Sequence, residues 1–229
     1  MNSTVSSSES KRRTTANTLF DVLHDDIVKM RLRPGARLSE AEVAKRHEVS
    51  RQPVREAFIR LDNLQLLQIR PQRATIVRAM SCESIKRARF MRLGVELEIA
   101  RRACERADKS SAERLQRHLD NQRALLDAGD VPGFISIDHV FHSEVCEIAD
   151  MSCAIEIIKD CKVTVDRLCV LSLSDEESAQ KIYDDHCAIA AHIAAGDGDK
   201  LAETTRKHLS RLDRTIDEVQ REHPDYFEE

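Results

Sequence analysis

The chain has 229 residues, of which 33% are charged and 3% aromatic, with no tryptophan. This composition is typical of a mainly helical protein. No stretch approaches the roughly 20 apolar residues that a membrane span needs, so we expect no membrane partner. The net charge of −4 is uneven: residues 1–80 carry a net +6 and the remainder a net −10. Unless this asymmetry is chance, it predicts a basic module that binds a polyanion, joined to an acidic module that does not.

The first residues and the cysteines indicate where the chain works. Residues 1–15 are rich in serine, include Lys11-Arg12-Arg13 and lack the apolar run of a signal peptide, so we expect a disordered tail. The seven cysteines are an odd number and form no C-x-x-C pair. Small buried side chains in a reducing compartment are their predicted role, which favours a cytoplasmic protein.

Three helices are predicted at the start of the folded chain. Apolar residues at helical spacing predict the first over about 16–31, and Pro34-Gly35 ends it. Ser39, with Glu42 three residues later, reads as a capping box that begins a short second helix. Ser50 is expected to cap the third.

The third helix has the features of a DNA-reading helix. Its first turn carries Arg51, Gln52 and Arg55, beside an apolar stripe that runs from Val54 to Leu64. A helix N-terminus offers free N–H groups and positive dipole to an anion. Arginine and glutamine can reach base edges in the major groove. We therefore expect these residues, with Ser50, to contact bases and nearby phosphates.

A short β-hairpin is predicted after this helix. Residues 67–70 and 75–78 alternate in polarity, and residues 71–74 contain a proline turn. Such a wing places Arg70 and Arg73 near phosphates or the minor groove. Arg37 is expected to hold the DNA backbone as well. Residues 16–79 are thus predicted to form a winged helix-turn-helix of three helices and a two-stranded wing.

The rest of the chain is predicted to be helical. Capping signals, apolar periodicity and glycine stops delimit six segments, over about 81–107, 110–130, 131–149, 153–171, 174–196 and 199–221. Short connections favour an all-α antiparallel six-helix bundle over residues 81–222.

Four residues of this bundle form a candidate metal site. Asp138 and His142 are four apart and share a helix face, while His186 and His208 lie on two other helices. If they converge in the bundle core, three imidazoles and a carboxylate suit zinc, with nickel or manganese as alternatives. The alternative from spacing alone is an exposed helix pair and unrelated histidines.

Arg92 and Glu96 are also four apart. They read either as an ordinary intrahelical ion pair or as a site in which Arg92 turns into the bundle and binds a carboxylate with two hydrogen bonds. Spacing alone favours the ordinary pair.

These motifs together resemble the GntR family of bacterial transcription regulators, FadR subfamily, along nearly the whole chain. The resemblance rests on Pro34-Gly35, Leu38-Ser39-Glu40, the run Val49–Ala57, Ile69–Ala74, Arg92 with Glu96, Asp138 with Phe141-His142, His186 with Ile189, and His208-Leu209. It implies a homodimer on a near-palindromic DNA operator, more often a repressor. It also implies an FCD-type effector domain, nearest the VanR-type branch with its six helices. There Asp138, His142, His186 and His208 would bind a divalent metal and Arg92 a small organic acid.

Three other interpretations stay open at this point. The first is a metal-dependent hydrolase with a DNA-binding head, because a metal held by three histidines and an aspartate can activate water. A regulator whose bundle binds its effector without metal is another. The third is a DNA-packaging protein, against which the acidic bundle argues.

Overall fold

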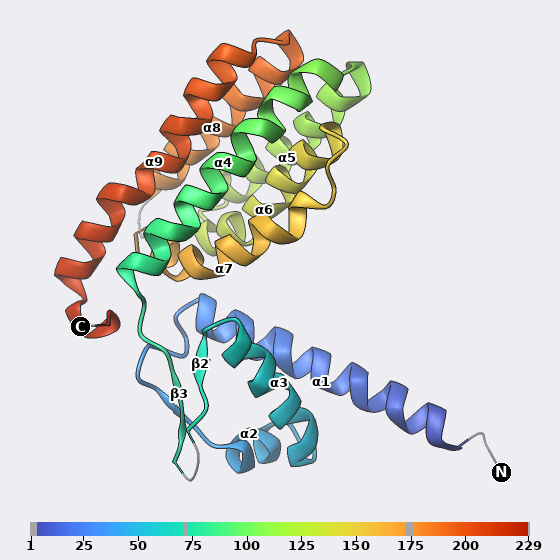
Figure 1. The fold of residues 1–229 in the computed structure, drawn as a ribbon, viewed down its shortest axis with the longest axis vertical. Helices are drawn as coiled ribbons and strands as arrows, with labels where there is room; N and C mark the ends of the chain where they lie inside the picture. The colour runs from blue at the N-terminus through green and yellow to red at the C-terminus, as the bar shows by residue number, and fades with distance from the viewer. Residues whose placement is uncertain (1–3, 71–72, 173–175, 229) are drawn as a thin grey trace. The chain divides into compact units, whose positions relative to one another are not determined.

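The computed structural model describes residues 4–70, 73–172 and 176–228, and the chain divides into two compact units (Figure 1). Unit 1 comprises residues 1–80 with 225–229, and unit 2 comprises residues 81–224. No helix within the described residues is long and apolar enough to cross a membrane.

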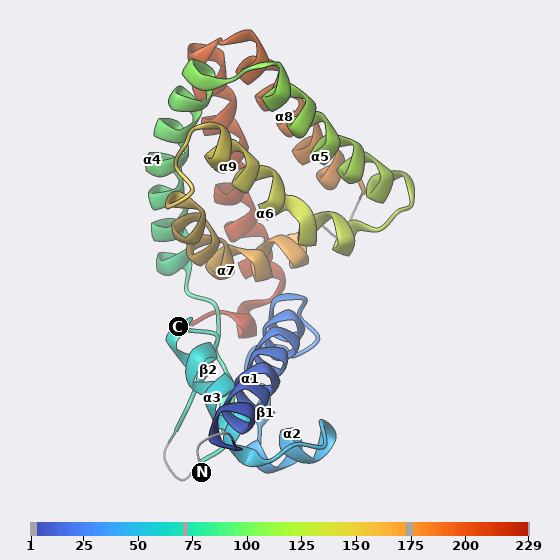
Figure 2. The ribbon, with the colours of Figure 1, turned by 90° about the vertical axis from the view of Figure 1, so that its right-hand side faces the viewer.

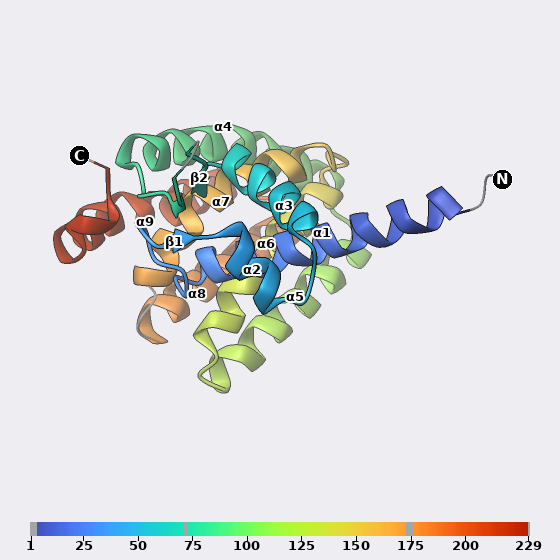
Figure 3. The ribbon, with the colours of Figure 1, turned by 90° about the horizontal axis from the view of Figure 1, so that it is seen from below.

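Unit 1 contains helices α1 (Thr4–Val28), α2 (Glu40–Arg46) and α3 (Arg51–Asn63), and α3 packs against both others (Figure 3). Its core includes Leu23, Ile27, Phe58 and Leu61, each at most 2% exposed. The helix α1 begins at Thr4, within the segment predicted to be a disordered tail. That segment contains no glycine or proline, so nothing in it ends a helix that is anchored further along.

The wing has three strands rather than the two predicted. They are β1 (Arg37–Leu38), β2 (Leu67–Gln68) and β3 (Thr75–Val77), in the order β1-β3-β2. Both pairings are antiparallel, with Ile76 of β3 between Arg37 and Gln68. The sequence predicts no strand at β1, because Arg37 and Leu38 lie between a Pro-Gly turn and the next helix without an alternating run around them. The predicted wing tip at Pro71 and Gln72 lies outside the described residues.

The predicted helix caps are only partly correct. Ser39 and Ser50 occupy the N-cap positions of α2 and α3 with extended backbone, but neither side chain makes a capping hydrogen bond. Ser81 does cap α4, since its Oγ accepts from the Ser84 amide at 3.3 Å. The capping box of α5 is formed by Asp108 with Ser111, whereas the sequence Ser110-Ser111-Ala112-Glu113 predicts one that begins two residues later.

The last residues of the chain return to unit 1. The amide of Met80 donates to the Tyr226 carbonyl at 2.7 Å, and the amide of Glu228 donates to the Met80 carbonyl at 2.8 Å. A parallel bridge joins Met80 to Phe227, whose side chain is buried. The 3₁₀ helix η1 (Pro224–Tyr226) precedes this bridge.

The six predicted helices of unit 2 are confirmed, each within three residues of its predicted ends (Figure 2). They are α4 (Cys82–Arg106), α5 (Lys109–Asp127), α6 (Val131–Ile148), α7 (Ala154–Ser172), α8 (Glu176–Ala195) and α9 (Gly198–Glu222). Helix α4 packs on α7 and α9, while α5 packs on α6 and α8. Buried Ile99, Leu119, Phe141 and Ile189 are part of the shared core.

Candidate functional site

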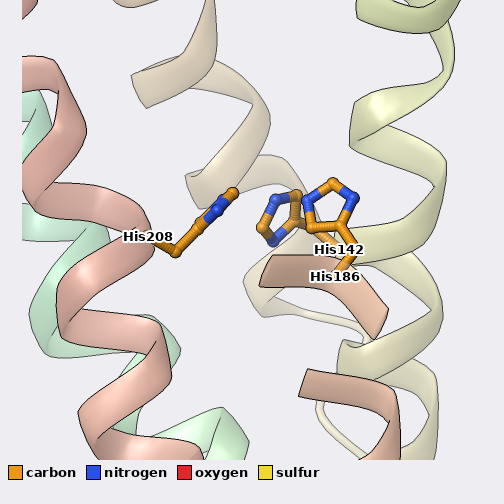
Figure 4. A group of neighbouring side chains, drawn as sticks. All are labelled: His142, His186 and His208. Atoms are coloured by element: carbon orange, nitrogen blue, oxygen red, sulfur yellow. The ribbon is translucent and has the colours of Figure 1, made fainter. Parts of the chain in front are cut away.

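Three histidines predicted as metal ligands converge in the core of unit 2. His142 of α6, His186 of α8 and His208 of α9 are all buried, and one ring nitrogen from each lies within 4.8 Å of the others. Their ring centroids are 5.0 to 5.4 Å apart. The side chains reach toward one another from three helices (Figure 4). The interpretation as unrelated surface histidines is therefore wrong.

Asp138, the fourth predicted ligand, lies beside two of these rings. Its Oδ1 is 3.4 Å from His186 Nε2, and its Oδ2 is 3.7 Å from His142 Nε2. The turn of α6 between Asp138 and His142 brings both side chains to one face. The four predicted residues thus form one cluster with facing nitrogen and oxygen donors.

Buried partners hold the other ring nitrogens. His142 Nδ1 is 3.1 Å from Glu96 Oε2, and His186 Nδ1 is 2.9 Å from Gln122 Oε1. These contacts assign the proton to Nδ1, because carboxylate and amide oxygens accept hydrogen bonds. Among the described residues, the Nε2 atoms of His142 and His186 have no hydrogen-bond partner. Each Nε2 atom therefore lies near Asp138 without a hydrogen bond.

The electrostatics of the cluster favour a neutral imidazole at His186 and at His208. Burial lowers the pKa of His186 well below its usual value, and it also lowers the pKa of His208. Asp185 Oδ2, 3.5 Å from His208 Nδ1, partly opposes this shift. A neutral imidazole is the form that coordinates a metal, so these two rings need to lose no proton at neutral pH.

Lys162 of α7 occupies a place in this cluster that the sequence analysis did not foresee. Its Nζ donates to Asp138 Oδ2 at 2.7 Å, and its side chain is 8% exposed. Burial alone would raise the pKa of the Asp138 carboxyl, but the ammonium of Lys162 and the three neighbouring histidines together outweigh it, and the pKa falls well below its usual value. In the structure Asp138 is an ionised carboxylate paired with an internal cation.

Arg92 of α4 combines the two interpretations given to it. Its Nε donates to Glu96 Oε1 at 2.7 Å, so the intrahelical pair exists. The pair is not an ordinary surface pair, however, because Arg92 is only 4% exposed. Its Nη2 is buried without a hydrogen-bond partner in the described part of the chain. One edge of the guanidinium is thus held, and a donor remains for a ligand.

A cavity of about 280 Å³ opens beside the cluster. Arg92, Asp138, Lys162 and His208 line it together with apolar side chains, among them Phe134, Ile182, Leu209 and Leu212. Cys169 also lines it, but burial raises the pKa of this thiol to about 12, so it stays protonated.

Of the seven free cysteines only Cys146 is fully buried, contrary to the expectation for the group.

The predicted DNA-contacting residues lie in unit 1 with exposed side chains. Arg51, Gln52 and Arg55 are in the first two turns of α3, directly after Ser50, and Arg37 is on β1. Arg70 precedes and Arg73 follows the residues at the wing tip that lie outside the description.

Two of these side chains are already held by acidic neighbours. Arg55 donates to both carboxylate oxygens of Glu40 at 3.1 and 2.9 Å, and these hydrogen bonds raise its pKa. Gln52 Nε2 donates to Glu56 Oε1 at 3.1 Å. The pairing with Glu40 fixes the direction of the Arg55 side chain. The sequence, in which Glu40 lies at the start of the predicted second helix, did not suggest this role.

Comparison with known proteins places this geometry in a family. The family described as "Bacterial regulatory proteins, gntR family" matches residues 15–77, and the FCD domain matches residues 88–211. The chain is 34% identical over 211 residues to the HTH-type transcriptional repressor RspR of Escherichia coli K12, covering 92% of each chain. It is 28% identical over 200 residues to a probable D-xylose utilization operon transcriptional repressor of Paenarthrobacter nicotinovorans, covering 86% of each.

Solved structures share the fold. Escherichia coli McbR/YncC superposes with a TM-score of 0.76 at 19% identity, covering 90% of this chain and 98% of that one. A GntR-type regulator from Rhodococcus sp. RHA1 gives 0.72 at 24% identity, covering 89% and 97%. The two family matches and the similarity to RspR overturn the hydrolase interpretation. The chain belongs to the GntR family of bacterial regulatory proteins, carries an FCD domain, and is a DNA-binding transcription regulator rather than an enzyme.

Proposed function

We propose that this protein is a metal-dependent, acid-sensing repressor that binds its DNA operator as a homodimer. The observation that carries the proposal is the pair of buried Nε2 atoms, on His142 and His186, that lie near Asp138 without a hydrogen-bond partner among the described residues, beside a cavity lined by Arg92. A buried polar atom without a partner is costly, and a bound ligand would remove that cost.

The donor set fits a divalent metal. His142, His186, His208 and Asp138 would hold it, and nitrogen and oxygen donors of this kind suit zinc, nickel or manganese. Buried hydrogen bonds from the non-coordinating ring nitrogens are the usual outer support of histidine ligands, and Glu96 and Gln122 supply them here. When bound, the metal would act as a Lewis acid for an oxygen of the effector.

The effector is proposed to be a small organic acid. The unpartnered Nη2 of Arg92 offers a hydrogen bond that suits a carboxylate oxygen. A volume of about 280 Å³, with charged and apolar side chains in its wall, limits the ligand to a small molecule. The alternative, an acid bound without metal, uses the same arginine and differs only in the role of the histidines.

DNA binding is proposed to follow the winged-helix mode, in the cytoplasm where the bacterial chromosome lies. Arg51, Gln52, Arg55 and Ser50 would contact bases and nearby phosphates from α3, and Arg37, Arg70 and Arg73 would hold the backbone. A near-palindromic operator requires two heads, hence a homodimer. Adjacent Phe90 and Met91 on α4 are 70% and 50% exposed, which favours an interface there.

The test compares metal content and acid binding in three proteins. The double variant His186→Ala, His208→Ala should lose the metal found by elemental analysis in the parent, while His139→Ala, which changes a histidine of α6 outside the three-histidine cluster, should keep it. Small carboxylates should raise the melting temperature of the metal-loaded parent and have less effect after chelation. Equal metal in the parent and the double variant would refute the metal site. An equal acid-induced shift with and without chelator would favour the metal-free alternative.

A further inference from the structure

Lys162 is a buried cation placed on a carboxylate that the proposed metal needs. Its ammonium donates to Asp138 Oδ2 at 2.7 Å, the same oxygen that lies 3.7 Å from His142 Nε2. A buried lysine is tolerated only when it is paired. In this structure its shorter ion pair is with Asp138, so a metal and an ammonium would share that carboxylate.

A second carboxylate, that of Asp166, lies next to the Lys162 ammonium. Asp166 is one turn further along α7, and its Oδ1 is 3.1 Å from Lys162 Nζ. That oxygen is buried and accepts no hydrogen bond within the described residues. Lysine is a flexible point charge on a four-carbon stem, so a small rotation would transfer its hydrogen bond from Asp138 to Asp166. Both Lys162 and Asp166 line the cavity.

The charges around the cluster favour such a transfer. Glu96, Asp138 and Asp166 carry three negative charges, and Arg92 and Lys162 carry two positive ones. A divalent ion beside Asp138 would repel an ammonium bonded to the same carboxylate, and the repulsion is strong where water is excluded. With the ion present the cluster would hold one net positive charge, which a single effector carboxylate balances.

We propose that Lys162 is an exchangeable internal cation, which holds Asp138 when the metal is absent and moves to Asp166 when a divalent ion binds. The inference rests on the proposed function, because it assumes that the four ligands take a metal. It adds that the metal must displace Lys162, so the lysine lowers metal affinity in exchange for a stable metal-free bundle. Lys162 acts on the metal through Asp138 and is itself no ligand.

The first test measures the affinity for Zn²⁺ alone by competition with a chromophoric chelator. Lys162→Met should bind Zn²⁺ about tenfold more tightly than the parent, because the metal no longer has a competitor for Asp138. Lys159→Met is the matched control, since Lys159 is on the same helix but 44% exposed and paired with Glu156. Its affinity should equal that of the parent. Lys162→Gln replaces the methionine variant if the latter does not fold.

A second variant should act in the opposite direction. Asp166→Asn removes the resting place of the ammonium, so Lys162 should hold Asp138 more firmly and Zn²⁺ should bind several-fold more weakly. In the Lys162→Met background the same change should have little effect. An equal loss in both backgrounds would overturn the role of Asp166.

The outcomes separate this inference from the proposed function. Zn²⁺ binding by the parent with equal or weaker binding by Lys162→Met would overturn the exchange and leave the metal site standing. Zn²⁺ binding by Lys162→Met alone would support the exchange in its strongest form. A failure of all the variants and the parent to bind Zn²⁺ would overturn both proposals.

Discussion

Glu96→Gln tests whether one buried carboxylate supports both the metal and the effector. Glu96 accepts from Arg92 Nε through Oε1 at 2.7 Å and faces His142 Nδ1 through Oε2 at 3.1 Å. Its pKa lies far below its usual value, because Arg92 and His142 outweigh the effect of burial, so both oxygens are acceptors at neutral pH. An amide has one oxygen and one NH₂ group, so in the variant one contact becomes donor against donor.

The expected size of the effect follows from this geometry. Loss of an outer partner of a metal-bound histidine lowers metal affinity about 10- to 100-fold, or roughly 1.4–2.7 kcal/mol. One mismatched buried hydrogen bond should also lower the free energy of unfolding of the metal-free protein by about 1–3 kcal/mol. Zn²⁺ competition and urea unfolding measure the two quantities. Glu98→Gln is the control, because Glu98 is on the same helix, 52% exposed and paired with Arg101 and Arg102.

Two outcomes would contradict the role given to Glu96. Glu96→Gln with the Zn²⁺ affinity of the parent would mean that the contact with His142 does not orient the ring for a metal. A loss of equal size in Glu98→Gln would point to the charge of α4 as a whole, since the two variants remove the same charge at different depths.

Three further predictions concern DNA, the core and the metal. Arg51→Ala should weaken binding to the cognate operator by roughly 1–3 kcal/mol in a gel-shift titration at fixed salt, whereas Arg87→Ala, an exposed change on α4, should not. Phe58→Ala removes a side chain that is 1% exposed, and it should lower the free energy of unfolding of unit 1 by about 3–5 kcal/mol in a urea titration. Zn²⁺ at 100 times its dissociation constant should stabilise the parent by about 2.7 kcal/mol and raise its melting temperature, and chelation should reverse the shift. His186→Ala should melt at one temperature with and without Zn²⁺; a metal-induced rise in that variant would contradict the ligand assignment.

The helices of unit 2 could be predicted from the sequence because each carries two independent signals. Apolar residues recur at helical spacing, and a capping residue or glycine marks the ends; Gly129 and Gly196 both adopt positive φ where helices stop. The signals that failed were local ones. Ser39 and Ser50 have the right identity and position for a cap but make no side-chain bond, because residue type alone does not fix a rotamer.

The polar residues that surround the candidate site have a sequence feature in common: each interrupts the apolar face of its helix. In α5, Gln122 falls between buried Leu119 and Leu126 at helical spacing, and in α7 Lys162 falls between buried Ile158 and Val165. Glu96 likewise interrupts the buried face of α4. A polar residue on an apolar stripe must find a partner inside the bundle, so its position predicts a buried network.

The apolar pattern of a helix does not identify the residue on another helix that its buried polar residue contacts. Periodicity fixes the direction of a side chain about its own helix axis, but a contact between two helices depends on their relative height and rotation. Lys162 and Asp138 are 24 residues apart on α7 and α6, and a shift of one turn along either helix would separate them by about 5 Å. The proposed ligands could be named from the sequence because their residue types suit one chemistry. The lysine could not, because an ammonium is no metal ligand and its place in the cluster depends on the packing of α7 against α6. Because Lys162 pairs with Asp138, the affinity of Lys162→Met for Zn²⁺ tests the assignment of Asp138 as a ligand together with the role of the lysine.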